Sequence, residues 1–378
     1  KKRIGIGVLI IGVLAFFFFT RTKMPEYNPE RDYIDMEAQI LEAFILAKDS
    51  STIQLPEGHF LFSQSLSLDA KKHITIKGMG MDKTILSFKG QTQGAEGIKV
   101  TNSENVIIED LAVEDAAGDN IKVSDTDTLT LRNIRSAWTG KVSTENGAYA
   151  LYPVLSTQVL IEGCEAIGSS DAGIYVGQSQ NVIIRNNKAY YNVAGIESEN
   201  SSNVEIYGNE AFENTSGLLI FNLPELTVYG KQVKAYQNKI YNNNIPNFGV
   251  KGSIVSAVPK GTGVVIMATQ DVAFYDNIVE DHKTSNLSVV SYKVFAADKD
   301  PQHNSLEEAA EAQGLRAIQM DYESDLKYNA YPGNISISAN RFSNQFSFPT
   351  LSNDFGKLWY FKNGTRIPDI AYDGILPE

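Results

Sequence analysis

The chain of 378 residues has few of the residues that most often build metal and covalent sites. It has one cysteine, Cys164, and four histidines, His59, His73, His282 and His303. One cysteine excludes an intrachain disulfide and a cysteine-rich metal site. The histidines share no motif, which disfavours a histidine-based triad or metal cluster. Because Cys164 occupies a predicted inward turn position, we interpret it as a small buried residue and not as a nucleophile.

The chain also has fewer basic than acidic residues. The chain has 33 Lys and Arg against 45 Asp and Glu, a formal net charge of −12. This balance disfavours nonspecific binding to nucleic acid or to an anionic membrane surface, and it counts against long polyanionic substrates. Hydrophobic residues make up 43% of the chain, which is enough for one sizeable core, so a single solenoid domain of this length is feasible.

A short phrase recurs three times at a regular spacing, in residues 158–165, 181–188 and 203–210. Cys164 and Asn187 are 23 residues apart, and Asn187 and Asn209 are 22 apart. A period in the twenties indicates a solenoid. The L-x-x-L-x-L frame of leucine-rich repeats is absent, and the apolar residues alternate as strands require. The sequence therefore predicts an all-β solenoid, a single-stranded parallel β-helix.

One turn position can be followed through the coils on either side of these repeats. It holds Met79, Leu111, Ile134, Cys164, Asn187, Asn209, Asn238, Asn277 and Asn340. Successive coils of a β-helix stack about one strand spacing, ~4.8 Å, apart. We therefore expect the side-chain amides of Asn187 and Asn209 to stack as a ladder that satisfies backbone groups in the turn.

The chain divides into four parts. Residues 1–23 combine a basic start with an uncharged apolar run, which predicts a signal anchor, or alternatively a cleaved signal peptide. No A-x-A cleavage site follows, which favours the anchor. The remainder is then expected in the periplasm or on the outer face of the membrane. We predict a linker over 24–34, a β-helix domain over 35–345 and a C-terminal cap or tail over 346–378.

Helices and long loops are expected to interrupt the coils. Apolar residues at helical spacing over 35–48 predict a helix that caps the exposed strand edges at the N-terminal end. Leu358–Phe361 is the corresponding candidate at the C-terminal end. Loop excursions are predicted over 138–146, 245–260 and 292–332, and long loops on repeat scaffolds often carry binding residues.

Four coil segments carry a likeness to known proteins: residues 147–153, 171–179, 192–197 and 261–264. Together they resemble a family of exported bacterial right-handed parallel β-helix repeat proteins, over residues 50–345. The resemblance implies a right-handed, pectin-lyase-like fold without an established activity, and a c-type haem protein as a partner. The fold is also similar to pectate lyases and alginate C5-epimerases. Leu151–Val154 stands where the epimerases carry Asp-Pro-His-Asp, which argues against epimerase chemistry.

Alternation assigns the side chains that face outward from one strand of each coil. Tyr175 points outward, whereas Ile174 and Val176 point inward. The equivalent outward positions are Lys99, Lys122, Tyr149, Tyr175, Glu197, Leu219 and Val265, and one step further Thr101, Ser124, Leu151, Gly177, Glu199, Phe221 and Met267. Tyrosines stack on sugar rings and donate hydrogen bonds. This strip therefore predicts a polysaccharide-binding face.

The expected binding residues are Trp138, Tyr149, Tyr152, Tyr175, Gln178, Glu197, Glu199, Asn200 and Asn222. If the protein is an enzyme, a polysaccharide lyase or uronate epimerase type is the best match. Lys122 would then pair with a uronate carboxylate, and Tyr149, Tyr175 or Glu197 would move a proton. The competing interpretation is a noncatalytic exported scaffold that serves a redox or metal protein such as a c-type cytochrome. A nucleic-acid partner is not expected, and only the N-terminal segment is expected to meet a membrane.

Four aspartates lie close together in the sequence: Asp115, Asp119, Asp125 and Asp127. Carboxylates from adjacent coils can bind calcium, which takes several oxygen ligands. Their spacing matches neither an EF-hand nor the glycine-rich calcium nonapeptide. Because aspartate is an ordinary turn residue, turn chemistry explains the four better than a metal site, and no cofactor is expected beyond this weak calcium candidate.

Overall fold

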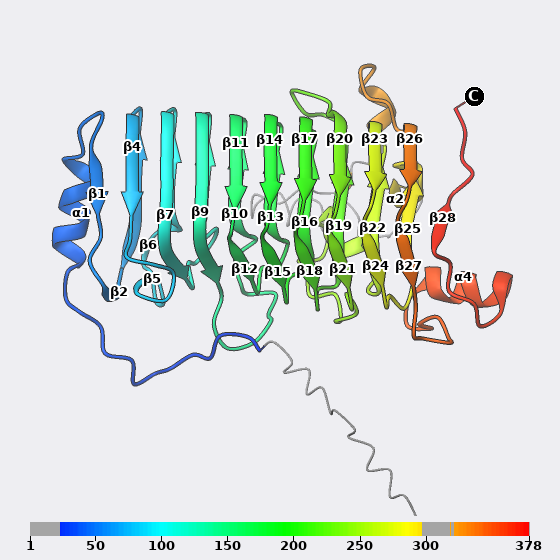
Figure 1. Cartoon of the computed structure of the whole chain (residues 1–378), viewed down its shortest axis with the longest axis horizontal. Coiled ribbons are helices and arrows are strands. Elements are labelled where there is room, and N and C mark those ends of the chain that lie inside the picture. Colours follow the sequence, from blue (N-terminus) through cyan, green and yellow to red (C-terminus); the bar gives the residue numbers. More distant parts are fainter. Residues whose placement is uncertain (1–22, 297–317, 319–320, 378) are drawn as a thin grey trace, which may run out of the picture.

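The computed structural model describes residues 23–296, 318 and 321–377, and its strands stack as successive coils along one axis (Figure 1). Strands of neighbouring coils pair in parallel, for example Val182 with Val204 and Ile184 with Ile206. The helix α1 (Glu37–Ile45) covers the first coil and buries Ile40 and Phe44 there. These findings confirm the parallel β-helix with an N-terminal capping helix.

The strands form two sheets. Sheet B has ten strands, one per coil. In order these are β3 (Gln64–Asp69), β6 (Gln93–Thr101), β8 (Ile121–Ser124), β10 (Tyr149–Val154), β13 (Ala172–Gly177), β16 (Ala194–Glu199), β19 (Ser216–Phe221), β22 (Thr262–Met267), β25 (Ser285–Val290) and β28 (Ile370–Tyr372).

Sheet A has eighteen strands in two legs that meet at a corner. The first leg is β1 (Thr52–Gln54), β4 (Lys72–Lys77), β7 (Glu104–Glu114), β9 (Asp127–Ala137), β11 (Thr157–Glu162), β14 (Gln180–Arg185), β17 (Ser202–Tyr207), β20 (Lys231–Tyr236), β23 (Gln270–Tyr275) and β26 (Gly333–Ser338). The second leg contains the ends of β7 and β9 with β2 (Gly58–Leu61), β5 (Thr84–Ser87), β12 (Glu165–Ile167), β15 (Lys188–Tyr190), β18 (Glu210–Phe212), β21 (Lys239–Tyr241), β24 (Ile278–Glu280) and β27 (Arg341–Ser343).

The asparagine ladder predicted at the corner between the two legs is present. Asn187 Nδ2 donates to Asn209 Oδ1 at 3.0 Å and to the Ile161 carbonyl oxygen at 3.0 Å. Asn187 Oδ1 in turn accepts from the Cys164 backbone nitrogen at 2.9 Å. The chain of amides continues through Asn238, Asn277 and Asn340. Each amide thus satisfies backbone groups that would otherwise be buried without partners.

The first position assigned to this ladder is wrong. Met79 is 53% exposed. Gly78 occupies the inner position instead, because a side chain there would meet the Leu111 Cβ at 2.9 Å. Leu111 and Ile134 do pair in register, and Cys164 is buried as predicted. Burial raises the pKa of the Cys164 thiol to about 12, so it stays protonated and unreactive.

A second asparagine ladder lies inside the coils and was not predicted from the sequence. Asn192 Nδ2 donates to Asn214 Oδ1 at 3.0 Å, and Asn214 Nδ2 donates to Asn243 Oδ1 at 2.9 Å. The ladder ends on His282, whose Nε2 lies 3.0 Å from Asn243 Nδ2 and whose Nδ1 lies 2.9 Å from Asn286 Oδ1. Burial lowers the pKa of His282 to about 4, so the neutral ring accepts from Asn243 and donates to Asn286. This histidine is structural.

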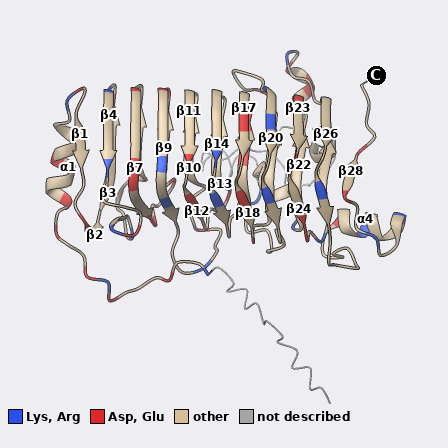
Figure 2. Cartoon of the chain, in the orientation of Figure 1, with Lys and Arg blue, Asp and Glu red and all other residues tan. Residues whose placement is uncertain are grey.

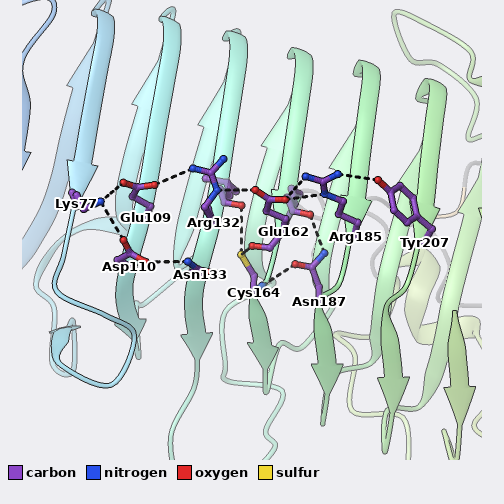
Figure 3. Close-up of polar contacts among 12 residues, drawn as sticks. Lys77, Glu109, Asp110, Arg132, Asn133, Glu162, Cys164, Arg185, Asn187 and Tyr207 are labelled. Carbon is purple, nitrogen blue, oxygen red and sulfur yellow. Dashed lines mark hydrogen bonds and ion pairs between the residues drawn. The ribbon is translucent and has the colours of Figure 1, made fainter. Parts of the chain in front are cut away.

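Residues of both charges lie along the strands of the first leg (Figure 2). Glu162 lies between two arginines: Arg132 Nε is 2.7 Å from Glu162 Oε1, and Arg185 Nε is 2.8 Å from Glu162 Oε2. Arg185 also donates to Tyr207, as Figure 3 shows. Beyond Tyr207, the rings of Tyr236 and Tyr275 stack at 4.9 and 5.0 Å. The charged and aromatic side chains of this row therefore contact one another, so their charges and ring faces already have partners within the row.

The segment predicted as a linker lies against the coils. The Gly140 nitrogen donates to the Pro25 carbonyl oxygen at 2.8 Å, and Arg31 forms an ion pair with Glu114 at 2.6 Å. Apart from Lys23, the predicted anchor over 1–23 lies outside the described residues. None of the described helices is both long and apolar enough to cross a membrane.

Candidate functional site

The outward face of sheet B is covered by a second layer. The excursion before β22 contributes the short helix η1 (Ile254–Ala257), and the excursion after β25 contributes α2 (Lys293–Ala296) and η2 (Tyr322–Ser324). Their side chains pack on outward residues of the strands in an apolar cluster separate from the coil interior. Its members include Tyr149, Tyr152, Tyr175, Leu219, Phe221, Ile254, Val255, Val265, Met267, Tyr292, Phe295 and Tyr322.

The predicted column of outward residues contains a register error. Leu151 pairs with Ile174, so Tyr152 and not Tyr149 lies between Lys122 and Tyr175. Leu151, assigned to the outward set, points into the coil interior. Placing Tyr149 with Tyr175 makes Gly147 the equivalent of Gly173, since each glycine precedes its tyrosine by two residues. Gly147 instead packs on Gly118, where a side chain would collide with the Gly118 carbonyl oxygen.

The tyrosines expected on an open binding face are buried. Tyr175 is 1% exposed, and its ring lies 4.6 Å from that of Tyr149 and 4.9 Å from that of Tyr152. These rings do project outward from sheet B, as alternation predicted, but the excursions fold over them. The expected accessible strip of Tyr149, Tyr175 and Glu197 is therefore wrong, since a sugar ring cannot reach faces that pack on other side chains.

Three carboxyl groups are buried beside these tyrosines. Tyr149 donates to Asp171 Oδ2 at 3.3 Å, and Tyr175 donates to Glu199 Oε1 at 2.9 Å. Burial, together with the neighbouring carboxylates, raises the pKa of Asp171 and of Glu197 well above the ordinary range. The same causes raise the pKa of Tyr149. The group is therefore a proton-holding cluster beneath the second layer, closed to large ligands.

The remaining predicted binding residues hold loops in place. Gln178 Oε1 accepts from the nitrogen and hydroxyl of Thr227. Asn200 bonds the backbone of Leu223, and Asn222 bonds the backbone of Gly230, so both fix the turn after β19. Trp138 packs in the coil interior and donates to the Ala116 carbonyl oxygen. These contacts use up the polar groups that were expected to meet a ligand.

The four aspartates considered for calcium have separate surroundings. Asp115 accepts from the nitrogen and hydroxyl of Thr139, both at 2.7 Å. Asp125 lies in an exposed turn with a φ of 50°, and exposed Asp127 accepts from Thr157. Among the residues that the structure describes, no three His, Cys, Asp or Glu are arranged to hold a metal ion. Asp115 and Asp125 have the positive φ of turn residues, whereas Asp127 begins β9.

Asp119 differs, because it lines a hollow at the N-terminal end of the covered region. The hollow has a volume of ≈ 420 Å³. Its walls come from β6, from β8 and the turn before it, and from the turn before β10, with Ser170 and Val250 at the margin. Its polar lining includes Glu96, Asp119, Lys122, Glu145, Asn146 and Ser170. The volume lies within the usual range for small-ligand sites, and the polar groups converge on one space.

Lys122 links two carboxylates in this hollow. Its Nζ lies 3.7 Å from Asp119 Oδ2 and 3.9 Å from Glu96 Oε1. It also lies 4.8 Å from the centre of the Tyr152 ring, which holds the ammonium by cation–π attraction. Burial raises the pKa of Asp119 to about 6, although the Lys122 charge opposes that shift. A carboxyl group of this pKa exchanges protons readily near neutral pH.

Lys122 is thus the one predicted catalytic candidate that reaches this hollow, whereas Tyr149, Tyr175 and Glu197 lie behind it under the second layer. From the sequence, Asp119 is a candidate only for calcium binding, and no motif distinguishes Glu96. The only sequence feature that points to this site is the three-residue spacing of Asp119 and Lys122 at the start of a strand, beside a long excursion.

Comparisons with known proteins define the class of fold. The model of the right-handed β-helix region family matches residues 139–295. The A-module of the mannuronan C-5 epimerase AlgE4 from Azotobacter vinelandii is similar in structure, with a TM-score of 0.51 and 15% identity over 90% of this chain and 91% of that module. The fold is therefore the right-handed, pectin-lyase-like parallel β-helix implied by the sequence resemblance.

Two further solved structures are similar over most of this chain. DFA-IIIase from Arthrobacter chlorophenolicus A6 gives a TM-score of 0.51 at 9% identity, covering 93% of this chain and 91% of that enzyme. The enzymatically active domain of tailspike protein 2 from bacteriophage CBA120 gives 0.53 at 10% identity, covering 94% of this chain and 47% of that one. At these identities the likeness concerns the fold alone. No curated protein sequence matches the chain significantly.

Proposed function

We propose that this protein binds a glycan in the hollow lined by Glu96, Asp119 and Lys122 and transfers a proton to or from it. The observation that carries the proposal is the hollow itself, where Lys122 lies within 4 Å of both carboxylates. Solved proteins of similar fold include a mannuronan epimerase module, which supports a carbohydrate ligand. The proposal moves the site from the buried tyrosines to the hollow at the N-terminal end of the covered region of sheet B.

The charges of the hollow favour a neutral sugar. Glu96, Asp119 and Glu145 contribute three carboxyl groups against the single ammonium of Lys122 in the lining. A polyuronate would bring further negative charge to this space, and the two nearby cations, Lys122 and Lys99 at 3.4 Å from Glu96 Oε1, do not outnumber the carboxyl groups. Neutral hydroxyl groups can instead donate to the carboxylates and accept from Lys122. This reasoning replaces the expected pairing of Lys122 with a uronate.

Asp119 is the proposed proton donor and Glu96 the proposed ionised partner. A carboxyl group with a pKa of about 6 is protonated in a useful fraction of molecules and can protonate a leaving glycosidic oxygen. A second carboxylate that activates water or stabilises positive charge completes the usual glycoside-hydrolysis arrangement. Lys122 positions both groups through its two ion-pair contacts.

The test uses the full chain in detergent with neutral and uronate oligosaccharides, measuring binding by calorimetry and cleavage by new reducing ends. Asp119→Asn should abolish cleavage and keep binding, because the amide can still accept from the Tyr149 nitrogen. Asp276→Asn, an equivalent change in an exposed turn, is the matched control and should leave both unchanged. The cleavage rate should fall as pH rises through about 6. Failure of every neutral glycan to bind would refute the proposal.

A further inference from the structure

The two ends of the solenoid are finished differently. At the N-terminal end, α1 covers the first coil, and Ile53 is only 5% exposed although its strand is the first. At the C-terminal end, the inward residues Ile335, Ile337 and Phe342 of β26 and β27 are only partly buried. In the preceding coil, Phe274 has no exposed surface. Among the described residues, the interior of the solenoid is thus less completely covered at its C-terminal end.

The expected C-terminal cap does not close this end. The helix α4 (Asp354–Asn363) lies past β27 at one corner of the last coil (Figure 1). Its residue Phe361 is 83% exposed. Half of the exposed large apolar side chains in the described chain lie in this C-terminal region, namely Phe348, Leu351, Leu358, Tyr360, Phe361, Ile370, Tyr372 and Leu376. Apolar side chains that gather at one end of a molecule mark a contact surface.

The last strands also present free edges. β26, β27 and β28 each pair with the preceding coil, and no other described strand pairs with their outer edges. Natural proteins usually protect such edges with charge, proline or a bulge. The strand β26, Gly-Asn-Ile-Ser-Ile-Ser, has no charge, and Arg341 is the one charged residue in the three strands. The backbone N–H and C=O groups along this edge can therefore form hydrogen bonds with another strand.

We propose that the C-terminal end binds the same end of a second copy of this chain, with β26 pairing antiparallel to its two-fold mate. A two-fold axis through the middle of β26 places this strand opposite its own copy, and its uncharged edge meets no like charge there. Strand pairing would satisfy the free backbone groups, and burial of Ile335, Ile337 and Phe342 would complete the core.

The capped N-terminal end limits this association to two copies. Head-to-tail stacking would need the first coil as an acceptor, and α1 occupies that position by burying Ile40 and Phe44 against it. An isologous contact between open ends uses up both, so the assembly closes as a dimer and does not grow into a fibre. The hollow near Asp119 lies in early coils, away from this end, so dimerisation leaves both hollows accessible.

The experiment measures the mass of the full chain in detergent by light scattering with the detergent contribution subtracted. The expected protein mass is twice the 41.6 kDa of one chain. Ser336→Lys places a charge on the exposed side of β26 without altering the core and should give single chains. Ser67→Lys makes the same change on the exposed side of β3, near the capped end, and should remain dimeric.

Three results would overturn the proposal. These are single chains of the unaltered protein at every micromolar concentration tried, dimers that survive Ser336→Lys, and species that keep growing with concentration. Circular dichroism of Ser336→Lys is the accompanying control. If circular dichroism shows that Ser336→Lys is unfolded, Ser338→Lys is used in its place, because Ser338 is the neighbouring outward position of the same strand. The outcome is independent of glycan binding, which is measured separately on the same samples.

Discussion

The outward faces of sheets A and B are built by the same alternation and end in opposite environments. On sheet A, Tyr207, Tyr236 and Tyr275 stack in a row whose edges reach solvent, next to the ion pairs around Glu162. On sheet B, Tyr152 and Tyr175 occupy equivalent outward positions and are buried under the second layer. Outward direction is thus a property of the strand, whereas exposure depends on the loops.

The two faces also treat carboxylates differently. Hydrogen bonds from Arg132 and Arg185, working against some desolvation, lower the pKa of Glu162 on sheet A. Burial beside Asp171 and Glu199 raises the pKa of Glu197 on sheet B. The same residue type therefore stabilises the fold when ionised on one face and destabilises it when ionised on the other.

The largest expected difference concerns matched tyrosines. Tyr175→Ala on sheet B should cost about 3–5 kcal/mol of unfolding free energy, because it leaves a cavity under the second layer. Tyr236→Ala on sheet A should cost about 1 kcal/mol, since it loses stacking contacts at a half-exposed position. Chemical denaturation of both variants measures the two losses. Equal losses would show that the second layer is not packed on sheet B.

The second prediction breaks the scaffold that both faces share. Asn187→Leu should cost about 1–3 kcal/mol, because it removes the acceptor of the Cys164 nitrogen and the donor to Ile161 in a buried turn. Gln180→Leu, at an exposed position of the adjoining strand, is the control and should change stability by about 0.5 kcal/mol or less. Matching denaturation midpoints for the two variants would count against the ladder.

This contrast explains what sequence alone could and could not predict. The Asn187 ladder was predictable because the period of 22 and 23 residues places equivalent residues one above another. The register at Tyr149 was not, because the excursion before it hides where the next strand begins. The burial of Tyr175 depends on the second layer, which comes from excursions far away in the sequence. Alternation carries no information about such contacts.

The candidate site was predictable only in part. Lys122 was identified because it shares an outward column with Tyr175. Asp119 precedes its strand, where aspartate is common in turns, so its sequence position does not distinguish a turn residue from a proton donor. Its raised pKa arises first from burial and then from the neighbouring Glu96 charge, against the opposing charge of Lys122, and only the folded chain brings these groups together.

The third prediction concerns pH and the covered face. The unfolded pKa of Glu197 is about 4.3, and the folded pKa is raised, so the folded state holds the proton more tightly. The stability that this proton contributes should therefore be fully present below the unfolded pKa and be lost as pH rises through the folded pKa. Glu197→Gln keeps the shape and removes this charge, so it should reduce that fall and stabilise the protein at neutral pH. Urea midpoints between acid and neutral pH measure the slope.

The smallest effect is expected for the corresponding change on the open face, and its sign should be opposite. The folded pKa of Glu162 is lowered, so its contribution is present above the unfolded pKa of about 4.3 and is lost as pH falls through the folded value. Glu162→Gln should therefore destabilise the protein at neutral pH, by about 1 kcal/mol or less because both arginines are partly exposed. Added salt should shrink this loss, whereas the gain from Glu197→Gln should persist, because water and ions reach only the first carboxylate. Stabilisation by both substitutions would mean that the ion pairs around Glu162 do not offset the cost of burying their charges.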